Sequence, residues 1–346
     1  MFAEPCNASP GQIPYPAMRS PDILFNREVG LSVNGTIVAT QNMTMTQQAP
    51  ACAPEAFAPT DSVQEAEAWT AHLARTHYEN FPVISLLLPR SLRQDFCNIY
   101  AFCRTADDLA DEMHDNQASL IWLEELRNRI SQCYDGRPQG KLAVALAGTI
   151  ARFDIPSQPF LDLIDAFEQD QRITRYDDFP QLLDYCRRSA DPVGRLVLYL
   201  CGYRDELRQH LSDQTCSALQ LTNFWQDVRN DILERDRIYI PQDSMRYFGV
   251  TEDQLRQGRC DDNYCELIRF EVRRTEAMFD AGEALLPLLD KSCRGHIALF
   301  GQGGRTIQQA IIRQNYDTLT ARPVLTARQK SRLILAGLAA SLRRLA

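Results

Sequence analysis

Two acidic segments of the chain carry side chains whose spacing suits metal-assisted chemistry on a phosphate. In the first, Asp107 and Asp111 are four residues apart, so on a helix both carboxylates project from one face. Asp108 and Glu112 form a second acidic pair with the same spacing. Like charges at this spacing destabilise an isolated helix, which calls for a compensating cation. Taken alone, this segment is also compatible with a solvated acidic face near a helix end.

The second acidic segment places Asn223, Asp227 and Asp231 at positions i, i+4 and i+8, which predicts one polar stripe over two helical turns. Phe224 and Trp225 flank the stripe, so we expect it to lie close to buried surface. One amide and two carboxylates are the hard oxygen ligands that Mg²⁺ prefers. Because Mg²⁺ bridges protein carboxylates to substrate phosphates, two facing helices of this kind would hold a diphosphate between them.

The elements that position these two segments are predicted to be helices. Ser62 and Glu65 form a capping-box pattern that opens a helix to about Arg75, and Ser91 is placed to cap another that runs to about His114. Further helices are predicted over 118–134, 140–153, 158–172, 178–189, 192–202, 212–234, 261–289, 295–315 and 325–345. Strand signals are nearly absent, because no segment alternates apolar and polar residues between Asn-Gly or Asp-Gly turns. The sequence therefore predicts a single all-α domain over residues 60–346.

Residues 1–59 differ in composition from the rest of the chain. They hold eight of the 18 prolines, only six charged residues and no helical apolar period. Such a segment buries too little surface to offset the entropy of ordering it. We expect it to be disordered, or to lie upstream of the natural start, with Met43 and Met45 as alternative initiators.

The charge balance excludes one broad class of function. The chain of 346 residues has 37 basic and 45 acidic side chains, and a net charge of −8 argues against a general nucleic-acid binder. The stretch from Lys291 to the end is basic, with Asp317 as its single acid. Its last part holds Arg322, Arg328, Lys330, Arg332, Arg343 and Arg344. We expect a terminal helix packed on the acidic body, and the alternative is peripheral contact with anionic lipid.

Cysteines and hydropathy predict a cytoplasmic protein. The 11 cysteines are odd in number, form no CxxC pair and mostly lie in apolar helical stretches, so we interpret them as reduced core residues. No stretch approaches the ~20 apolar residues of a membrane span. The N-terminus lacks the basic and apolar regions of a signal peptide.

Four motifs together resemble the squalene/phytoene synthase family. They are the DDLAD of residues 107–111, the NxxxDxxxD of 223–231, the YAFCR of 100–104 and the RIYIP of 237–241. The resemblance runs from about residue 70 to the C-terminus. It implies the all-α isoprenoid synthase bundle, with a central active-site cavity, and Mg²⁺ as cofactor.

The resemblance also implies roles for residues at matching positions. The implied Mg²⁺ ligands are Asp107, Asp111, Asn223, Asp227 and Asp231. The implied contacts to the substrate diphosphate are His77, Asn80, Arg104 and Arg237. Gln220, Tyr100 and Tyr239 match pocket residues, and the two tyrosines are implied to support carbocations or to deliver protons to the leaving group.

Plain alternatives exist for several of these residues. Tyr100 and Tyr239 also suit core aromatics with hydrogen-bonded hydroxyls, and His77 suits the C-terminal end of a helix. Arg104 would contribute little if it only paired with neighbouring aspartates at the surface. Arg237 follows Asp231 by six residues where five are expected in relatives, so the loop at 232–236 carries an extra residue.

Several details resemble one branch of the family, the hydroxysqualene synthases, which convert presqualene diphosphate to hydroxysqualene with water. Gln226 stands where phytoene and presqualene diphosphate synthases usually carry a diphosphate-binding arginine, a charge that a site for one diphosphate would not need. The segments 77–83, 191–197 and 303–317 also fit this branch. The branch implies no NADPH, and functional coupling to a presqualene diphosphate synthase and a hydroxysqualene reductase.

Three alternatives stay open. Within the family, they are a presqualene diphosphate or squalene synthase acting on two farnesyl diphosphates, and then a phytoene synthase acting on two geranylgeranyl diphosphates. From another class, a catalytically silent helical assembly factor is disfavoured because both sets of ligands are kept. Residues 301–305 are a poor dinucleotide-binding fingerprint, since no strand precedes them, although squalene synthases lack that fingerprint as well.

Overall fold

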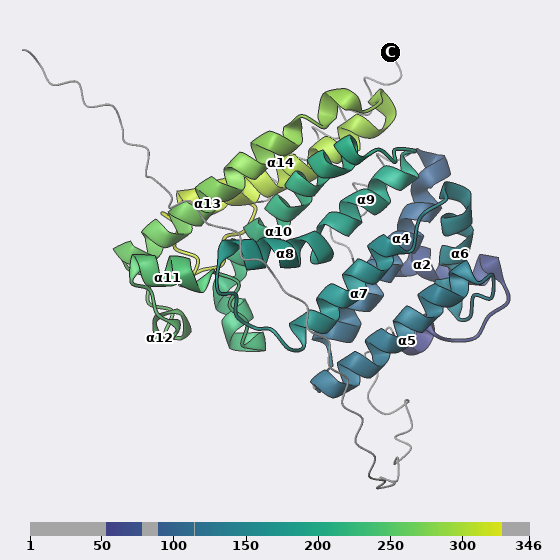
Figure 1. The fold of residues 1–346 in the computed structure, drawn as a ribbon, viewed down its shortest axis with the longest axis horizontal. Helices are drawn as coiled ribbons and strands as arrows, with labels where there is room; N and C mark the ends of the chain where they lie inside the picture. Colours follow the sequence, from purple (N-terminus) through teal and green to yellow (C-terminus); the bar gives the residue numbers. More distant parts are fainter. Residues whose placement is uncertain (1–52, 78–88, 114, 327–346) are drawn as a thin grey trace, which may run out of the picture. The chain divides into compact units, whose positions relative to one another are not determined.

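Helices are the only regular secondary structure in the part of the chain that the computed structural model describes, residues 53–77, 89–113 and 115–326 (Figure 1). The elements are α1 (Ala53–Ala56), α2 (Val63–His77), the 3₁₀ turn η2 (Arg90–Leu92), α4 (Arg93–Asp111), α5 (Asn116–Tyr134), α6 (Lys141–Phe153), α7 (Gln158–Asp170), α8 (Phe179–Ser189), α9 (Asp191–Leu200), α10 (Glu206–Arg235), α11 (Gln242–Phe248), α12 (Glu252–Arg256), α13 (Asp262–Glu283), the 3₁₀ turn η3 (Leu286–Leu288) and α14 (Lys291–Arg313). Arg175 and Ile238 form an isolated bridge between two connecting segments. The all-α prediction is confirmed.

Capping side chains explain where several helices begin. A backbone N–H in the first turn, which has no partner inside its helix, is satisfied by a side chain just before the helix. The residues that accept such a bond are Asp115, Asp178, Asp205, Thr251 and Asp261. In the predicted capping box, Glu65 N donates to Ser62 Oγ at 3.2 Å.

Several predicted helix limits differ from the structure: α10, for example, begins at Glu206 and not at residue 212. Ser91 caps no helix, because it lies inside the 3₁₀ turn η2 that follows Pro89, and α4 begins only at Arg93. The helix predicted over 261–289 ends at Glu283 and is followed by η3, whose Pro287 cannot continue an α-helical hydrogen-bond ladder. Of the helix predicted over 325–345, residues 325 and 326 are not helical and the others lie outside the described residues.

The packed part of the chain begins before residue 60. Ala56 of α1 is fully buried, and the ring of Phe57 stacks on Trp122 with centroids 5.4 Å apart. Trp69 Nε1 donates to Glu55 at 3.1 Å, which ties α1 to α2. Residues 53–59 are therefore part of the helical core, whereas the prediction for residues 1–52 concerns residues outside the described part.

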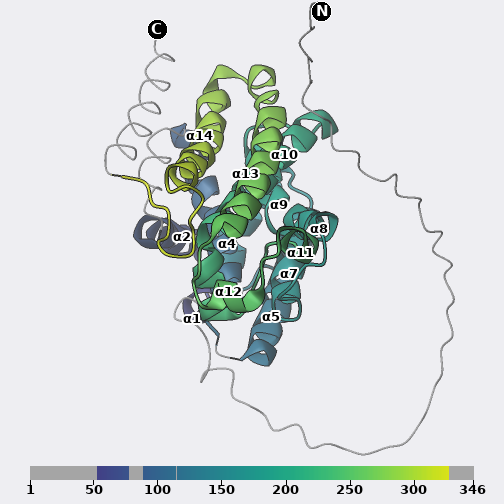
Figure 2. The same ribbon diagram turned by 90° about the vertical axis from the view of Figure 1, so that its left-hand side faces the viewer.

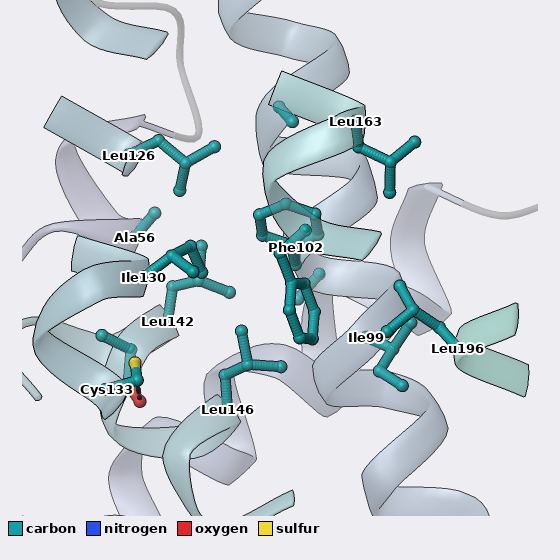
Figure 3. Packing of buried hydrophobic residues seen from close by; sticks show 14 of the residues in the cluster. Ala56, Ile99, Phe102, Leu126, Ile130, Cys133, Leu142, Leu146, Leu163 and Leu196 are labelled. Atoms are coloured by element: carbon teal, nitrogen blue, oxygen red, sulfur yellow. Dashed lines mark hydrogen bonds between the residues drawn. The ribbon is translucent and has the colours of Figure 1, made fainter. Parts of the chain in front are cut away.

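The hydrophobic core consists of two main clusters. The first is built from α2, α4, α5, α6 and α7, with Phe102 and Phe160 packed edge to face at a centroid distance of 5.0 Å. Figure 3 shows Phe102 between Leu126 and Ile130 on one side and Leu163 on the other. The second cluster surrounds α10 and contains the fully buried Trp225, whose Nε1 donates to Thr275 of α13 at 2.9 Å.

The helices that carry the acidic segments meet through a common neighbour. α10 packs along α13 and α14 and also against α8 and α9, and the two views show α10 and α13 side by side (Figures 1 and 2). α4 packs against α2, α5, α6, α7 and again α9. Because α9 contacts both α4 and α10, the fold brings the two acidic helices against one common helix.

All nine cysteines in the described residues are free thiols. Cys97, Cys133 and Cys186 are buried, in line with the interpretation of these residues as small core side chains. No helix within the described ranges is both long and apolar enough to cross a membrane.

Candidate active site

The first acidic motif lies in the last turns of α4, where Arg104 supplies the cation that its charge pattern calls for. The Arg104 guanidinium contacts Asp107 at 3.3 Å and Glu112 at 3.0 Å, and it also pairs with the buried Asp108. This shared cation offsets the repulsion between carboxylates one turn apart. Its Nε atom is buried and donates to no partner among the described residues, so Arg104 is more than a solvated surface ion pair.

The second acidic motif forms the predicted stripe on α10. Asn223 is exposed, while Asp227 and Asp231 are partly buried. The helix ends at Arg235, and Asp236 then takes a left-handed conformation with a φ of 51°. Residues 232–235 of the expected loop are therefore helical, and the chain turns at Asp236.

Two arginines, one at the end of α10 and one just beyond it, join the two motifs. Arg237 Nη1 lies 2.8 Å from Asp111 Oδ1, and Arg235 Nε lies 3.3 Å from Asp111 Oδ2. The Arg237 side chain is buried, which strengthens this ion pair. The predicted Arg237 is thus brought to the predicted Asp111 across 126 residues of sequence.

The proximity of the two motifs is visible in their electrostatics. Burial, reinforced by the charge of Asp111, raises the pKa of Asp107 to about 6. Burial and the neighbouring Asp227 raise the pKa of Asp231 to about 7, and Asp111 adds to this effect from the opposite motif. Carboxylates that repel one another in this way gain most from an added cation.

The donor set fits Mg²⁺, because it consists of carboxylate and amide oxygens. Within residues 53–77, 89–113 and 115–326, no three His, Cys, Asp or Glu side chains lie close enough together to hold a metal ion by themselves. Oxygen atoms of water and of a diphosphate would therefore complete the coordination shell of the metal, as is usual for Mg²⁺.

Asp170, the last residue of α7, is a site residue that the sequence analysis missed. It is buried, accepts a hydrogen bond from Tyr185 Oη at 2.6 Å and lies 4.0 Å from Arg237 Nη1. Burial raises its pKa to about 7. Its Oδ1 atom accepts no hydrogen bond from any described residue. No periodic spacing marks Asp170 in the sequence, so its role is visible only once α7 packs against α4.

An aromatic cluster lies directly behind these charges. Tyr239 is buried and stacks on Phe224 with ring centroids 3.7 Å apart. Tyr176 and Tyr185 each lie 5.8 Å from Tyr239. Burial raises the pKa of Tyr239 well above its ordinary value, so its hydroxyl stays protonated. Tyr239 is thus both a core aromatic and a neighbour of the acidic motifs.

The remaining predicted residues lie on α2, α4 and α10 or outside the described part of the chain. Tyr100, on α4 one turn before Arg104, is half-buried and packs beside Ala74 and Cys97. Gln220 is half-buried on α10, three residues before Asn223. His77 is the last residue of α2, and its side chain lies outside the described part, as does the whole of Asn80.

A C-terminal strap, residues 314–326, lies over the second motif. Arg322 contacts both carboxylate oxygens of Asp227, with Nη2 at 2.9 Å from Oδ2. The buried Gln226 donates to the Pro323 carbonyl, and Arg229 Nη1 donates to the Leu319 carbonyl at 3.3 Å. The sequence analysis placed Arg322 in the basic C-terminal segment and did not connect it with Asp227. The side chain at position 226 therefore holds the strap, and Arg322 brings a cation to the motif from another segment.

The structure is an all-helical scaffold with two acidic motifs joined by arginines. Comparison of the sequence with known families identifies the class, which is that of synthases acting on prenyl diphosphates. A family model described as squalene/phytoene synthase matches residues 74–329, and the chain belongs to this family. The 15-cis-phytoene synthase of Synechococcus elongatus is 30% identical over 80% of this chain and 93% of its own. The phytoene synthase of Thermus thermophilus is 33% identical over 77% of this chain and 91% of its own.

Solved structures give the same family and fold. The squalene synthase HpnC of Alicyclobacillus acidocaldarius is 41% identical, covers 73% of this chain and 95% of its own, and superposes with a TM-score of 0.70. A dehydrosqualene synthase solved in complex with a ligand is 24% identical, with a TM-score of 0.73 over 80% of this chain and 96% of its own. This second likeness bears on the fold alone.

Proposed function

We propose that this protein converts presqualene diphosphate to hydroxysqualene with Mg²⁺ and without NADPH. The bond between carbon and the diphosphate oxygen breaks, the resulting cation rearranges, and the oxygen of a water molecule forms the new bond to carbon. The observation that carries the proposal is the facing of the two acidic motifs across Asp111, Arg235 and Arg237. It provides a binding region for one diphosphate at the mouth of an aromatic cluster.

The charged residues would bind the departing diphosphate and stabilise its negative charge. Mg²⁺ held by Asp107, Asp111, Asn223, Asp227 and Asp231 would neutralise its negative charge. Arg104, Arg237 and Arg322, which now pair with these carboxylates, would turn toward diphosphate oxygens when the ligands arrive. Charge that is already in place before the reaction stabilises a developing anion at little reorganisation cost.

The aromatic cluster would protect the cation. The faces of Tyr239 and Phe224 present negative π density, which attracts positive charge. The apolar surroundings also keep bulk water away while the carbon skeleton rearranges. The hydrogen bond from Tyr185 to Asp170 fixes the orientation of both groups at the border between this cluster and the acidic motifs.

The choice among family members rests on two further observations. Gln226 is committed to the strap, so position 226 offers no arginine for a second diphosphate. The 41% identical neighbour is named a squalene synthase, which supports a C30 product. The second candidate function, phytoene synthesis from two geranylgeranyl diphosphates, is favoured by the names of the relatives at 30% and 33% identity.

One assay separates these reactions. Purified protein with Mg²⁺ and no NADPH is given presqualene diphosphate, farnesyl diphosphate or geranylgeranyl diphosphate in separate tubes, and the lipid products are identified by mass spectrometry. We expect hydroxysqualene from the first substrate and no condensation in the other two. Phytoene from the third tube, or presqualene diphosphate from the second, would reassign the protein within its family.

If the proposal holds, a presqualene diphosphate synthase supplies the substrate and a hydroxysqualene reductase consumes the product. Peripheral contact with anionic lipid through the basic C-terminal segment stays a prediction, because residues 327–346 lie outside the described part.

A further inference from the structure

Tyr185 and Ser189 of α8 are four residues apart and therefore lie on one face of this helix. Tyr185 donates its hydroxyl hydrogen to Asp170 at the border of the acidic region. Ser189 lies one turn, about 6 Å, further along α8. α8 ends at Ser189, and α9, which begins at Asp191 after the non-helical Ala190, packs against α4, α7, α8 and α10. Ser189 therefore lies one turn from the border of the acidic region, just before a helix that contacts both α4 and α10.

The Ser189 hydroxyl has no hydrogen-bond partner within the described ranges. Its Oγ atom is buried and forms no hydrogen bond with any described residue. Burying a hydroxyl without a partner is unfavourable, so such a group is usually satisfied by water or a ligand. Because Tyr185, one turn earlier on the same face, belongs to the aromatic cluster of the proposed carbocation site, a hydroxyl of this kind is suited to hold one water molecule there.

The backbone around Ser189 is held firmly. Asp191, two residues later, is buried and accepts a hydrogen bond from Ser217 of α10 at 2.7 Å. At Gly194 the two helices approach so closely that a Cβ atom would lie 2.4 Å from Cys216 Sγ. Pro192 fixes the first turn of α9. These contacts lock the junction against α10, so a water bound by Ser189 would have a defined position.

From this arrangement we propose that Ser189 holds the water molecule that captures the rearranged cation. The inference rests on the proposed function. One water hydrogen is donated to Ser189 Oγ, which leaves an oxygen lone pair directed at the cationic carbon. The water oxygen forms the bond to carbon, and the proton that it then loses passes to an oxygen of the departed diphosphate. Ser189 is a positioning residue in this step, because it acts through the water.

The test is a change in product partition, measured with presqualene diphosphate and Mg²⁺. Without the held water, the cation loses a proton and yields a C30 polyene hydrocarbon in place of the alcohol. We expect Ser189→Ala to lower the ratio of alcohol to hydrocarbon by about tenfold or more while substrate consumption stays within a few-fold of wild type. Ser189→Thr, which keeps a hydroxyl at the same place, should restore most of the alcohol.

The matched control is Ser119→Ala. Ser119 of α5 is also a buried serine whose hydroxyl has no hydrogen-bond partner among the described residues, but it lies in a different part of the fold. Ser119→Ala should leave the ratio of alcohol to hydrocarbon unchanged. Alcohol as the sole product of folded Ser189→Ala would overturn the inference, as would an equal loss of alcohol in Ser189→Ala and Ser189→Thr. If wild-type protein itself makes no alcohol, the proposed function fails and the inference fails with it.

Discussion

Asp227→Ala should abolish turnover while leaving the helical fold intact. Asp227 lies in the middle of the α10 stripe and faces outward to Arg322, so its removal creates no cavity in the core. The change removes a proposed metal ligand and leaves Arg322 without its carboxylate partner. Loss of electrostatic stabilisation of this kind costs about 10³-fold in kcat. Steady-state kinetics with presqualene diphosphate, beside far-ultraviolet circular dichroism, measures both parts of the prediction.

The control for Asp227 comes from the same helix. Asp213 also lies on α10 and also pairs with an arginine through two contacts, here Arg195 at 2.7 and 3.0 Å. It lies outside the proposed ligand stripe, so Asp213→Ala should retain turnover within about an order of magnitude. Equal activity of Asp227→Ala and wild type would remove the metal assignment. An equally deep loss in Asp213→Ala would show that the effect is structural.

Arg237→Gln should give the largest loss of stability. Its guanidinium is 8% exposed and is the buried cation between Asp111 and Asp170. Breaking a buried ion pair on one side leaves an uncompensated charge, and about 3 kcal/mol of unfolding free energy should be lost at pH 8. Urea unfolding at fixed Mg²⁺ concentration measures this loss. The exposed pair of Arg137 and Asp135 serves as control, and Arg137→Gln should change stability little.

The loss in Arg237→Gln should shrink as the pH falls. The folded-state pKa of Asp170 is already raised to about 7, so the folded protein takes up a proton there as the pH drops below that value. Removing Arg237 raises this pKa further, because Arg237 is the main group that opposes the effect of burial. At pH 8 the variant therefore either keeps a buried Asp170 carboxylate without its cation or binds a proton there against the bulk pH, and both cost free energy, whereas at pH 5.5 Asp170 is protonated with or without Arg237. A loss that is constant between pH 5.5 and 8 would contradict the ion-pair explanation.

Local sequence patterns were sufficient to predict the helical fold and the placement of the two acidic motifs. Spacings of three and four residues fix which side chains share a helix face, so Asp107 with Asp111, and Asp227 with Asp231, followed from the sequence. The limits of helices were harder to predict where a 3₁₀ turn replaced an α-helical turn, as at Ser91. Such alternatives differ by little free energy within a few residues.

The contacts that complete the site join residues far apart in the sequence, and no periodic spacing of residues predicts them. Asp170 reaches the site only because α7 packs against α4. Arg322 lies 95 residues after Asp227, and an extended strap returns it to α10. Gln226 illustrates the same limit, since its residue type indicated a lost charge, whereas its buried contact with Pro323 shows a structural role. The extra residue between Asp231 and Arg237 does not prevent Arg237 from contacting Asp111.

The most direct test of water capture uses wild-type protein, Mg²⁺ and presqualene diphosphate in water enriched in ¹⁸O. Capture of the cation by solvent places the heavy isotope in the hydroxyl group, so mass spectrometry should find hydroxysqualene two mass units heavier in proportion to the enrichment. Unlabelled hydroxysqualene would mean that a diphosphate oxygen, and not water, captured the cation, and unlabelled presqualene alcohol would mean that the bond between phosphorus and oxygen broke in place of the bond between carbon and oxygen. Either result would contradict ionisation followed by water capture.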